Sequence, residues 1–292
     1  MKTKTFTPIL LCAVVSVLVI TCGCTMPTQT AQGKQLTVFA AASLTDAFTE
    51  IGQSYHAQHP DINVSFNFDG SQILRTQIEQ GAYADVFAAA NMRYMNALKD
   101  EGLMINSSVT IFAKNKLVVI VPKANPVHIS NMSDLARPET KLVIGTKDSP
   151  CGEYTLQMLG KIANDTTYGQ EYKNRVLLNV VSQEPNVMDI VTKVALGEAD
   201  GGIVTVSDVP SQYKDKVEKI TIPDTFNIVA QYPIGVVSGS KNAQQAQNFV
   251  DLVNSREGQA ILQKYGFIVQ QGLTSQNAAT TGVISQRTTT IA

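Results

Sequence analysis

The sequence predicts an α/β protein in which strands and helices alternate along the chain. Short apolar runs of four or five residues recur, and most are followed by a stretch whose apolar residues repeat every three or four positions. This alternation is typical of parallel strands covered by helices on both faces. Of the 292 residues, 44% are hydrophobic and only 16% are charged. That composition indicates a folded body and excludes a disordered acidic tail protein.

The predicted strands are the apolar runs, and the predicted helices follow from the spacing of the apolar residues after them. The strands are expected at residues 36–40, 64–68, 86–90, 117–121, 142–145, 177–181, 202–206 and 234–237. One helical face after the first strand is formed by Leu44, Ala47, Phe48, Ile51 and Tyr55. Further helices are expected over 73–78, from 95 to near 102, through 158, over 187–195 and from 249 through 262. Parallel sheets bind ligands at the carboxyl ends of their strands, so the loops after the strands are where function is expected.

Residues 1–24 are predicted to be a lipoprotein-type signal peptide. Lysines at the start precede an apolar stretch, Ile9–Ile20, which is shorter than the roughly 20 residues that a membrane-spanning helix needs. Cys24 follows Gly23 just after this stretch and is the predicted lipidation site. Cys22 fits this pattern less well, and an uncleaved or ordinarily cleaved leader is the alternative. The protein is therefore expected outside the cytoplasm, anchored to the cell membrane.

The segments that flank the folded body are polar. Residues 25–34 are predicted to be a flexible tether, and residues 271–292 are predicted to be a poorly ordered tail. Cys151 is the only cysteine outside the leader, so the body cannot contain a disulfide framework. With 23 basic and 24 acidic residues, the formal net charge is −1. This balance argues against a nucleic-acid partner.

Four predicted loops lead from a strand into a helix through small or turn-forming residues: 40–46, 69–72, 149–154 and 184–187. Each would present free backbone N–H groups and the positive end of a helix dipole, which together favour anions. No lysine or arginine stands at the centre of any of them, and the nearby Arg75 and Lys147 are expected to be solvated surface charges. The alternative for Ser43 and Ser71 is that each only caps a helix.

The chain resembles the molybdate-binding proteins of ABC importers. The segment that carries the resemblance most clearly is Leu36–Phe48, with the sequence LTVFAAASLTDAF. The match continues through residues 70–81 and 84–90, and it resumes at 115–122, at 202–204 with Ser207 and Asp208, and at 265–267. It therefore covers nearly the whole body in order.

The resemblance implies a class II periplasmic binding protein fold with two lobes, made of mixed sheets flanked by helices. One lobe would comprise residues 35–117 plus 237–270, and the other residues 118–236. The ligand would lie in the cleft between them. The implied protein is a monomer that binds molybdate or tungstate and delivers it to an ABC permease with its ATPase. It would not be an enzyme, and it would need no cofactor.

The resemblance also implies a set of oxyanion-binding residues. Ser43 and Ser71 correspond to hydroxyl donors that also offer their backbone N–H groups, and Cys151 and Val187 correspond to backbone donors. Thr205 stands where the family has a tyrosine, so a water or another group is the alternative for this contact. No protein atom would bind the metal directly, because molybdenum or tungsten is held as its oxyanion. A site made of donors suits these dianions, which carry no proton at neutral pH.

Three alternatives stay open at this stage. Sulfate or another small oxyanion is one, because only size separates sulfate from molybdate. A second is a related type of site in which protein carboxylates complete the coordination, for which Asp148, Glu153 and Glu184 are conceivable ligands. The third is an extracytoplasmic hydrolase that uses Ser43 or Cys151, although the sequence identifies no base to activate either nucleophile.

Overall fold

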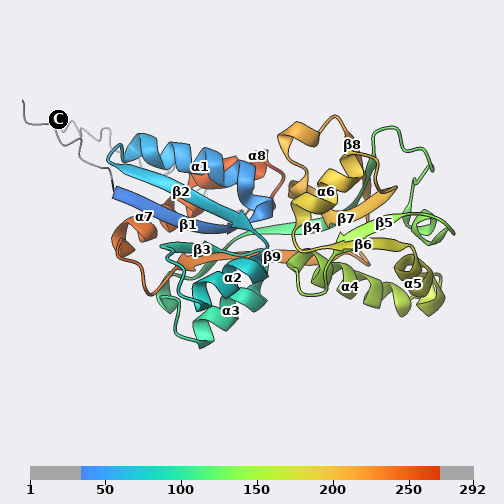
Figure 1. Ribbon diagram of the computed structural model, residues 1–292, viewed down its shortest axis with the longest axis horizontal. Coiled ribbons are helices and arrows are strands. Elements are labelled where there is room, and N and C mark those ends of the chain that lie inside the picture. Colours follow the sequence, from blue (N-terminus) through green and yellow to red (C-terminus); the bar gives the residue numbers. More distant parts are fainter. Residues whose placement is uncertain (1–33, 270–292) are drawn as a thin grey trace, which may run out of the picture. The chain divides into compact units, whose positions relative to one another are not determined.

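The computed structural model describes residues 34–269. The predicted signal peptide with Cys24, nearly all of the tether and the polar tail lie outside the described residues. The described part is built on one mixed sheet with the strand order β2-β1-β3-β9-β4-β7-β5-β6, to which β8 is added by pairing with β4 (Figure 1). The predicted α/β class with mixed sheets flanked by helices is confirmed. Within residues 34–269, no helix combines the length and the apolar character needed to cross a membrane.

The strands are short apart from the central one. Their bounds are β1 (Lys34–Ala41), β2 (Ile62–Asp69), β3 (Val86–Ala88), β4 (Thr110–Pro122), β5 (Leu142–Gly145), β6 (Val180–Glu184), β7 (Gly201–Thr205), β8 (Val217–Thr221) and β9 (Val229–Val236). The α-helices are α1 (Thr45–Gln58), α2 (Ser71–Glu79), α3 (Met92–Asp100), α4 (Pro150–Ala163), α5 (Gly169–Leu178), α6 (Val187–Ala195), α7 (Ala243–Asn254) and α8 (Arg256–Lys264).

Strand β4 joins the two halves of the sheet. It pairs with β9 up to Lys116, and with β7 and β8 from Leu117 or Val118 onward. We call β2, β1, β3, β9 and the beginning of β4 the first half, and the end of β4 with β7, β8, β5 and β6 the second half. Figure 1 shows β4 running through the middle of the sheet. The predicted division into two lobes stays a prediction.

The partner change in β4 is supported by a side-chain amide. The backbone N–H of Leu117 donates to Asn227 Oδ1 at 2.9 Å, and the Asn227 amide donates to the Leu117 carbonyl at 2.9 Å. Asn227 is buried. Because a buried backbone group without a partner is costly, this amide lets the strand leave one neighbour and reach the next with Leu117 fully hydrogen-bonded.

Helices cover both faces of each half of the sheet. In the first half, α1, α7 and α8 contact one another, and α2 packs against α3. In the second half, α4 packs against α5, while α6 contacts β4, β5 and β7. Figure 1 shows α6 on one side of these strands and α4 with α5 on the other. The predicted face of α1 is confirmed, since Ala47, Phe48, Ile51 and Tyr55 are at most 1% exposed. Phe48 contacts the rings of Phe66, Phe112 and Phe249.

Two predicted strands are corrected by the structure. The run at 177–181 is split, because Leu177 and Leu178 end helix α5 and β6 begins at Val180. Short apolar runs do not distinguish a helix end from a strand by periodicity alone. The strand expected at 234–237 begins earlier, at Val229, and contains Pro233. Proline cannot donate to a ladder, and the β4–β9 register shifts between Ile111, the partner of Pro233, and Ala113. Strand β8 and helix α5 were not predicted.

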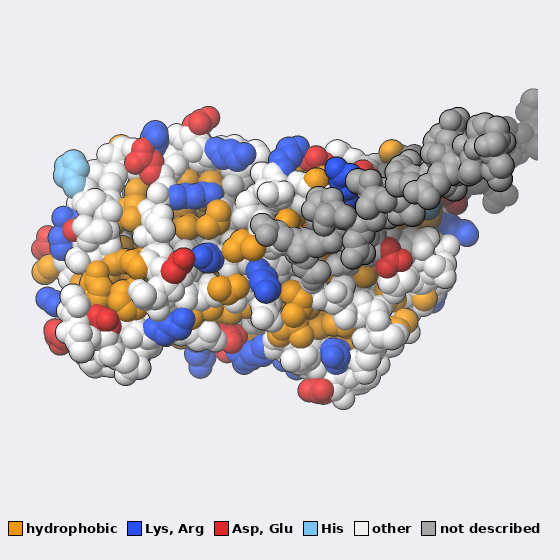
Figure 2. Space-filling model, turned by 180° about the vertical axis from the view of Figure 1, so that it is seen from behind, with side chains coloured by type: hydrophobic (Ala, Val, Ile, Leu, Met, Phe, Trp, Pro, Cys, Tyr) orange, Lys and Arg blue, Asp and Glu red, His pale blue; other side chains and the backbone are white. Residues whose placement is uncertain are grey.

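The charged residues are distributed without a continuous basic patch on the face shown in Figure 2. Lysine and arginine side chains lie singly or in small groups there, among aspartate, glutamate and uncharged residues. This distribution agrees with the near-neutral net charge of the whole chain.

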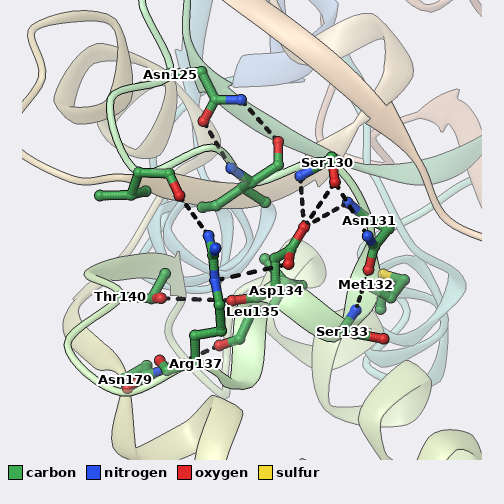
Figure 3. Close-up of polar contacts among 12 residues, drawn as sticks. Asn125, Ser130, Asn131, Met132, Ser133, Asp134, Leu135, Arg137, Thr140 and Asn179 are labelled. Carbon is green, nitrogen blue, oxygen red and sulfur yellow. Dashed lines mark hydrogen bonds and ion pairs between the residues drawn. The ribbon is translucent and has the colours of Figure 1, made fainter.

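The segment before β5 is held by a local polar network, drawn in Figure 3. The Asp134 carboxylate accepts from the Ser130 N–H at 2.8 Å, the Ser130 hydroxyl at 2.9 Å and the Asn131 N–H at 3.1 Å. Asn131 in turn accepts from the Ser133 N–H at 2.9 Å. Arg137 Nε lies 3.7 Å from Asp134 Oδ1. The backbone N–H of Ser130 is the main cause that lowers the pKa of Asp134 below its ordinary value.

We expect Asp134→Ala to lower the free energy of unfolding by about 1 kcal/mol at pH 7, the usual effect of losing a helix cap. A carboxyl whose folded pKa is depressed stabilises the protein above its unfolded pKa, and this contribution disappears as the pH falls through the folded pKa. Urea unfolding at pH 7 and at successively lower pH should therefore show a difference in stability between wild type and variant that closes as the pH falls through the lowered pKa of Asp134. Equal stability at pH 7 would contradict this role of Asp134.

Candidate ligand-binding site

One small pocket gathers the loops that follow β1, β2, β5, β6 and β7, with a wall from β9. All five residues predicted to bind the ligand line it: Ser43, Ser71, Cys151, Val187 and Thr205. The cavity volume is about 30 Å³, whereas a pocket for a drug-sized ligand or cofactor has roughly 300–1,000 Å³. The pocket therefore fits a ligand of only a few heavy atoms.

Residues at the starts of several helices line this pocket. Ser71 and Val187 are the first residues of α2 and α6, Cys151 is the second residue of α4, and Ser43 lies in the 3₁₀ turn that precedes α1. First-turn N–H groups have no partner within their own helix, and the helix dipole adds partial positive charge there. Their convergence makes a site for an anion without any cationic side chain.

The Ser71 hydroxyl is oriented as a donor. Its Oγ accepts the Ala90 N–H at 3.0 Å, and the residue is 1% exposed. Among the described residues no acceptor lies within reach of its O–H, which is therefore left for a ligand. Gly70 allows this loop to approach the loop before α6, because a Cβ at Gly70 would lie 2.7 Å from the Pro185 carbonyl oxygen. Gln72 Nε2 donates to the same oxygen at 2.6 Å, across the pocket.

The Ser43 hydroxyl is buried and has no partner of normal hydrogen-bond geometry among the described residues. Ser43 lies close enough to the Tyr232 hydroxyl to lower the pKa of Tyr232, although the larger effect of burial raises it. Leaving a buried polar group unpaired costs about 1–3 kcal/mol, so such a group in a pocket wall points to a ligand atom that would accept from it. The small side chains of Ala41 and Ala42 complete this wall.

The Cys151 thiol is already hydrogen-bonded within the protein. Its Sγ lies 3.2 Å from the Ile203 carbonyl oxygen, to which the thiol donates. Burial raises the pKa of this thiol well above its ordinary value. A neutral thiol is a poor nucleophile, and no histidine is among the described residues that line the pocket. The hydrolase alternative therefore lacks an activated nucleophile, and Cys151 has its backbone N–H to offer.

Thr205 belongs to a buried hydroxyl chain. Its Oγ1 accepts from Asn115 Nδ2 at 2.9 Å and lies 3.4 Å from the Tyr232 hydroxyl. Asn115 also donates to the Ser207 hydroxyl at 2.7 Å. All of Asn115, Thr205 and Tyr232 are at most 3% exposed. Because Thr205 already accepts from Asn115, its O–H is left to donate to Asp208, to Tyr232 or to a ligand.

Sequence reasoning missed two polar residues of the pocket wall, Tyr232 and Asp208. Tyr232 lies in the middle of β9, which pairs antiparallel with β3 and β4, so it does not lie in a loop after a strand. Asp208 accepts from the Thr205 N–H through Oδ2, while its Oδ1 is buried without a partner. Burial raises the pKa of Asp208 to about 7. In the sequence, the spacing of Thr205 and Asp208 indicates only that the two residues could cap the start of a helix.

The three carboxylates considered as alternative ligands do not line the pocket. Glu153 lies 3.1 Å from the Asn91 amide and 3.6 Å from Arg93, and Glu184 pairs with Lys193. The Asp148 backbone carbonyl accepts from Tyr94. Among residues 34–269 no cluster of histidine, cysteine, aspartate and glutamate could hold a metal ion.

Comparison with known proteins places these observations in a family. The chain matches the model of bacterial extracellular solute-binding proteins over residues 36–268. It is 36% identical over 253 residues to the molybdate-binding protein ModA of Mycobacterium tuberculosis H37Rv, covering 85% of this chain and 92% of that protein. The resemblance seen in the sequence is confirmed.

Solved structures have the same fold. The substrate binding domain of a putative molybdenum ABC transporter from Clostridium difficile is 28% identical, with a TM-score of 0.62, covering 81% of this chain and 99% of that one. The sulfate-binding protein SubI of Mycobacterium tuberculosis has a TM-score of 0.70 over 80% of this chain and 86% of that one. Its identity is 17%, so it shows the fold alone.

We expect Gly152→Ala to destabilise the protein by roughly 1–3 kcal/mol, as overpacking does. A Cβ at Gly152 would lie 2.0 Å from the Thr146 carbonyl oxygen and 2.4 Å from that of Gly145, so α4 would have to move away from the end of β5. Thermal unfolding measures the effect. The matched control is Gly160→Ala in the same helix, where a Cβ meets nothing within 4 Å and alanine should stabilise by about 0.5–1 kcal/mol. Similar effects at the two glycines would refute the close contact.

Proposed function

Because the chain belongs to the molybdate-binding proteins among the bacterial extracellular solute-binding proteins, we propose that it captures molybdate or tungstate and delivers it to an ABC importer. The observation that carries this proposal is the convergence of helix N-termini and free hydroxyl groups on one small pocket. No lysine, arginine or histidine is among the described residues that line it. A binding role rather than an enzymatic one follows from the same donor set.

Neutral donors can hold a dianion when they are fixed in place and sheltered from water. The donors here are held by helices and by buried hydrogen bonds such as that from the Ala90 N–H to Ser71, so they need little reorganisation when the anion arrives. Molybdate and tungstate carry no proton at neutral pH and therefore require only donors. Hydrogen phosphate carries a proton, for which backbone N–H donors offer no acceptor.

Sulfate is the second candidate, favoured by the shared fold with a sulfate-binding protein. Sulfate is also a dianion without a proton, so only its shorter bonds distinguish it. A pocket that fits molybdate would stretch the hydrogen bonds to sulfate beyond the usual range of about 2.7–3.2 Å. Each weakened hydrogen bond costs on the order of 1 kcal/mol, and the cost is shared by several donors.

Tyr232 is the proposed source of the hydroxyl contact that the family resemblance assigns to the segment around Thr205. The Thr205 side chain is short, and its Oγ1 already accepts from Asn115. The Tyr232 hydroxyl lies 3.4 Å from this oxygen and lines the same pocket. Burial raises the pKa of Tyr232, so its hydroxyl keeps its proton and can donate. We therefore assign oxyanion contacts to Ser43, Ser71, Cys151 and Val187. The fifth contact is assigned to Tyr232, which lies beside Thr205.

The location and partners of the protein follow from the same proposal. The predicted signal peptide and Cys24 support an extracytoplasmic protein held to the membrane by a lipid, and both lie outside the described residues. The implied partners are an ABC permease and its ATPase, with this chain acting as a monomer. The near-neutral net charge of the chain gives no support to a nucleic-acid partner.

We expect molybdate and tungstate to stabilise the mature protein. Ligand at about 1,000 times its Kd should raise the free energy of unfolding by about 4 kcal/mol, which appears as a higher Tm. Sulfate and phosphate at the same concentration serve as matched anions and should shift the Tm much less. The proposal fails if neither molybdate nor tungstate shifts the Tm, and a larger shift with sulfate would favour the second candidate.

Tyr232→Phe should weaken molybdate binding by about ten- to a hundred-fold, because a hydrogen bond to a charged group contributes about 1.5–3 kcal/mol. Calorimetric titration measures the Kd. Tyr55→Phe is the control, since it removes another largely buried hydroxyl, one that donates to Gln245 in the first half of the sheet. If Tyr232→Phe binds molybdate with unchanged affinity while Ser71→Ala binds it more weakly, Tyr232 does not contact the anion.

A further inference from the structure

Asp208 is a buried carboxyl group with one oxygen that the protein does not use. The residue is 2% exposed and lines the pocket. Its Oδ2 accepts the Thr205 N–H, which fixes the carboxyl group against the end of β7. Its Oδ1 is buried and has no hydrogen-bond partner among the described residues. A carboxyl oxygen without a partner is therefore placed in the wall of a pocket that is rich in donors.

No cation neutralises this carboxyl group. Among the described residues, Asp208 forms no ion pair. Lys219 of β8 is a positive charge that acts to lower the pKa of Asp208, but its Nζ donates to the Val206 carbonyl oxygen at 2.5 Å. From α4 and β9, the Cys151 thiol and the Tyr232 phenol face Asp208, and burial raises the pKa of both, so they stay neutral near pH 7.

The second carboxyl group of the pocket wall is Asp69, and its surroundings differ. Its Oδ1 accepts the Gly70 N–H at 2.7 Å, and the residue is only half-buried. Water can therefore reach Asp69. Asp208 lacks that exposure, so burial disfavours its ionised form, although hydrogen bonds from the Thr205 N–H and side chain offset part of this effect.

A bound dianion would add like charge to this carboxyl group. An ionised group that is buried without a counterion is already costly, and this burial raises the pKa of Asp208 to about 7 before any ligand is bound. A like charge in the same cavity raises the pKa of a carboxyl group further. Above neutral pH, the unliganded protein and the complex therefore hold different numbers of protons.

We propose that Asp208 carries a proton whenever the oxyanion is bound, so that binding above neutral pH takes up about one proton and makes Asp208 Oδ1 a further donor in the pocket. The proton comes from solvent and stays on the carboxyl group, so the anion itself remains proton-free. This inference rests on the proposed function. It also adds to selectivity, because a protonated carboxyl group offers no acceptor suited to hydrogen phosphate, whereas an ionised one would.

The test is calorimetric titration of the mature protein with molybdate at pH 8, in two buffers of different ionisation enthalpy. The difference in apparent enthalpy gives the number of protons taken up, which we expect to be close to one. The Kd should rise by up to about tenfold per pH unit above pH 7.5, because one proton is linked to binding. In Asp208→Asn, which keeps a neutral side chain of the same shape, proton uptake should vanish and the Kd should stay nearly constant with pH.

Asp69→Asn is the matched control, since it removes a negative charge from the same wall and should leave the proton uptake in place. Folding of Asp208→Asn is checked by thermal unfolding. Because the raised pKa makes the ionised Asp208 destabilising above pH 7, the neutral variant should be at least as stable there.

The inference is overturned if the wild type binds molybdate without taking up a proton, a measurement that needs no variant. It is also overturned if Asp208→Asn still takes one up. If molybdate does not bind at any pH, the proposed function itself fails, and this inference with it.

Discussion

The pocket depends on one constraint, which is that an anion taken out of water must find fixed hydrogen-bond donors on every side. The first turns of α2, α4 and α6 supply such donors without a helical partner for them. Each of these helices follows a different strand, so the donors can meet only if the strands end at a common place. The strand order brings these strand ends together. Glycines allow the loops to approach closely, and buried hydroxyl groups add further donors at the same place.

Gly70 and Gly152 show how backbone packing sets the pocket. A side chain at either position would collide with a carbonyl oxygen of a neighbouring loop. The loops can therefore approach until their N–H groups face one small cavity. The Pro185 oxygen receives the Gln72 amide at 2.6 Å, so the loop before α6 is fixed to the start of α2. Positions of donors in this pocket are thus determined by main-chain contacts more than by long side chains.

Much of the fold and most of the pocket wall could be predicted from the sequence. Apolar spacing located α1 and its buried face. Small residues after strands located four loops, and the family resemblance singled out Ser43, Ser71, Cys151 and Val187 within them. What could not be predicted came from parts of the chain without such a signal. Tyr232 reaches the pocket because β9 lies antiparallel between β3 and β4, and no local sequence pattern predicts that pairing. The unpaired oxygen of Asp208 is a property of three-dimensional burial. The end of α5 was mistaken for a strand because Leu177 and Leu178 adjoin the apolar residues of β6.

The amide pairing at Leu117 makes one side chain a link between two segments. Asn227 gives Leu117 two hydrogen bonds at the residue where β4 has left β9 and pairs with β7. The same side chain donates to the Ile222 carbonyl and accepts from the Ile228 N–H. One buried side chain therefore ties β4 to the segment between β8 and β9. Two residues earlier, Asn115 donates to Thr205 in the pocket wall. The change of strand partner in β4 and a hydrogen bond to the wall of the ligand cavity therefore lie in the same short stretch of one strand.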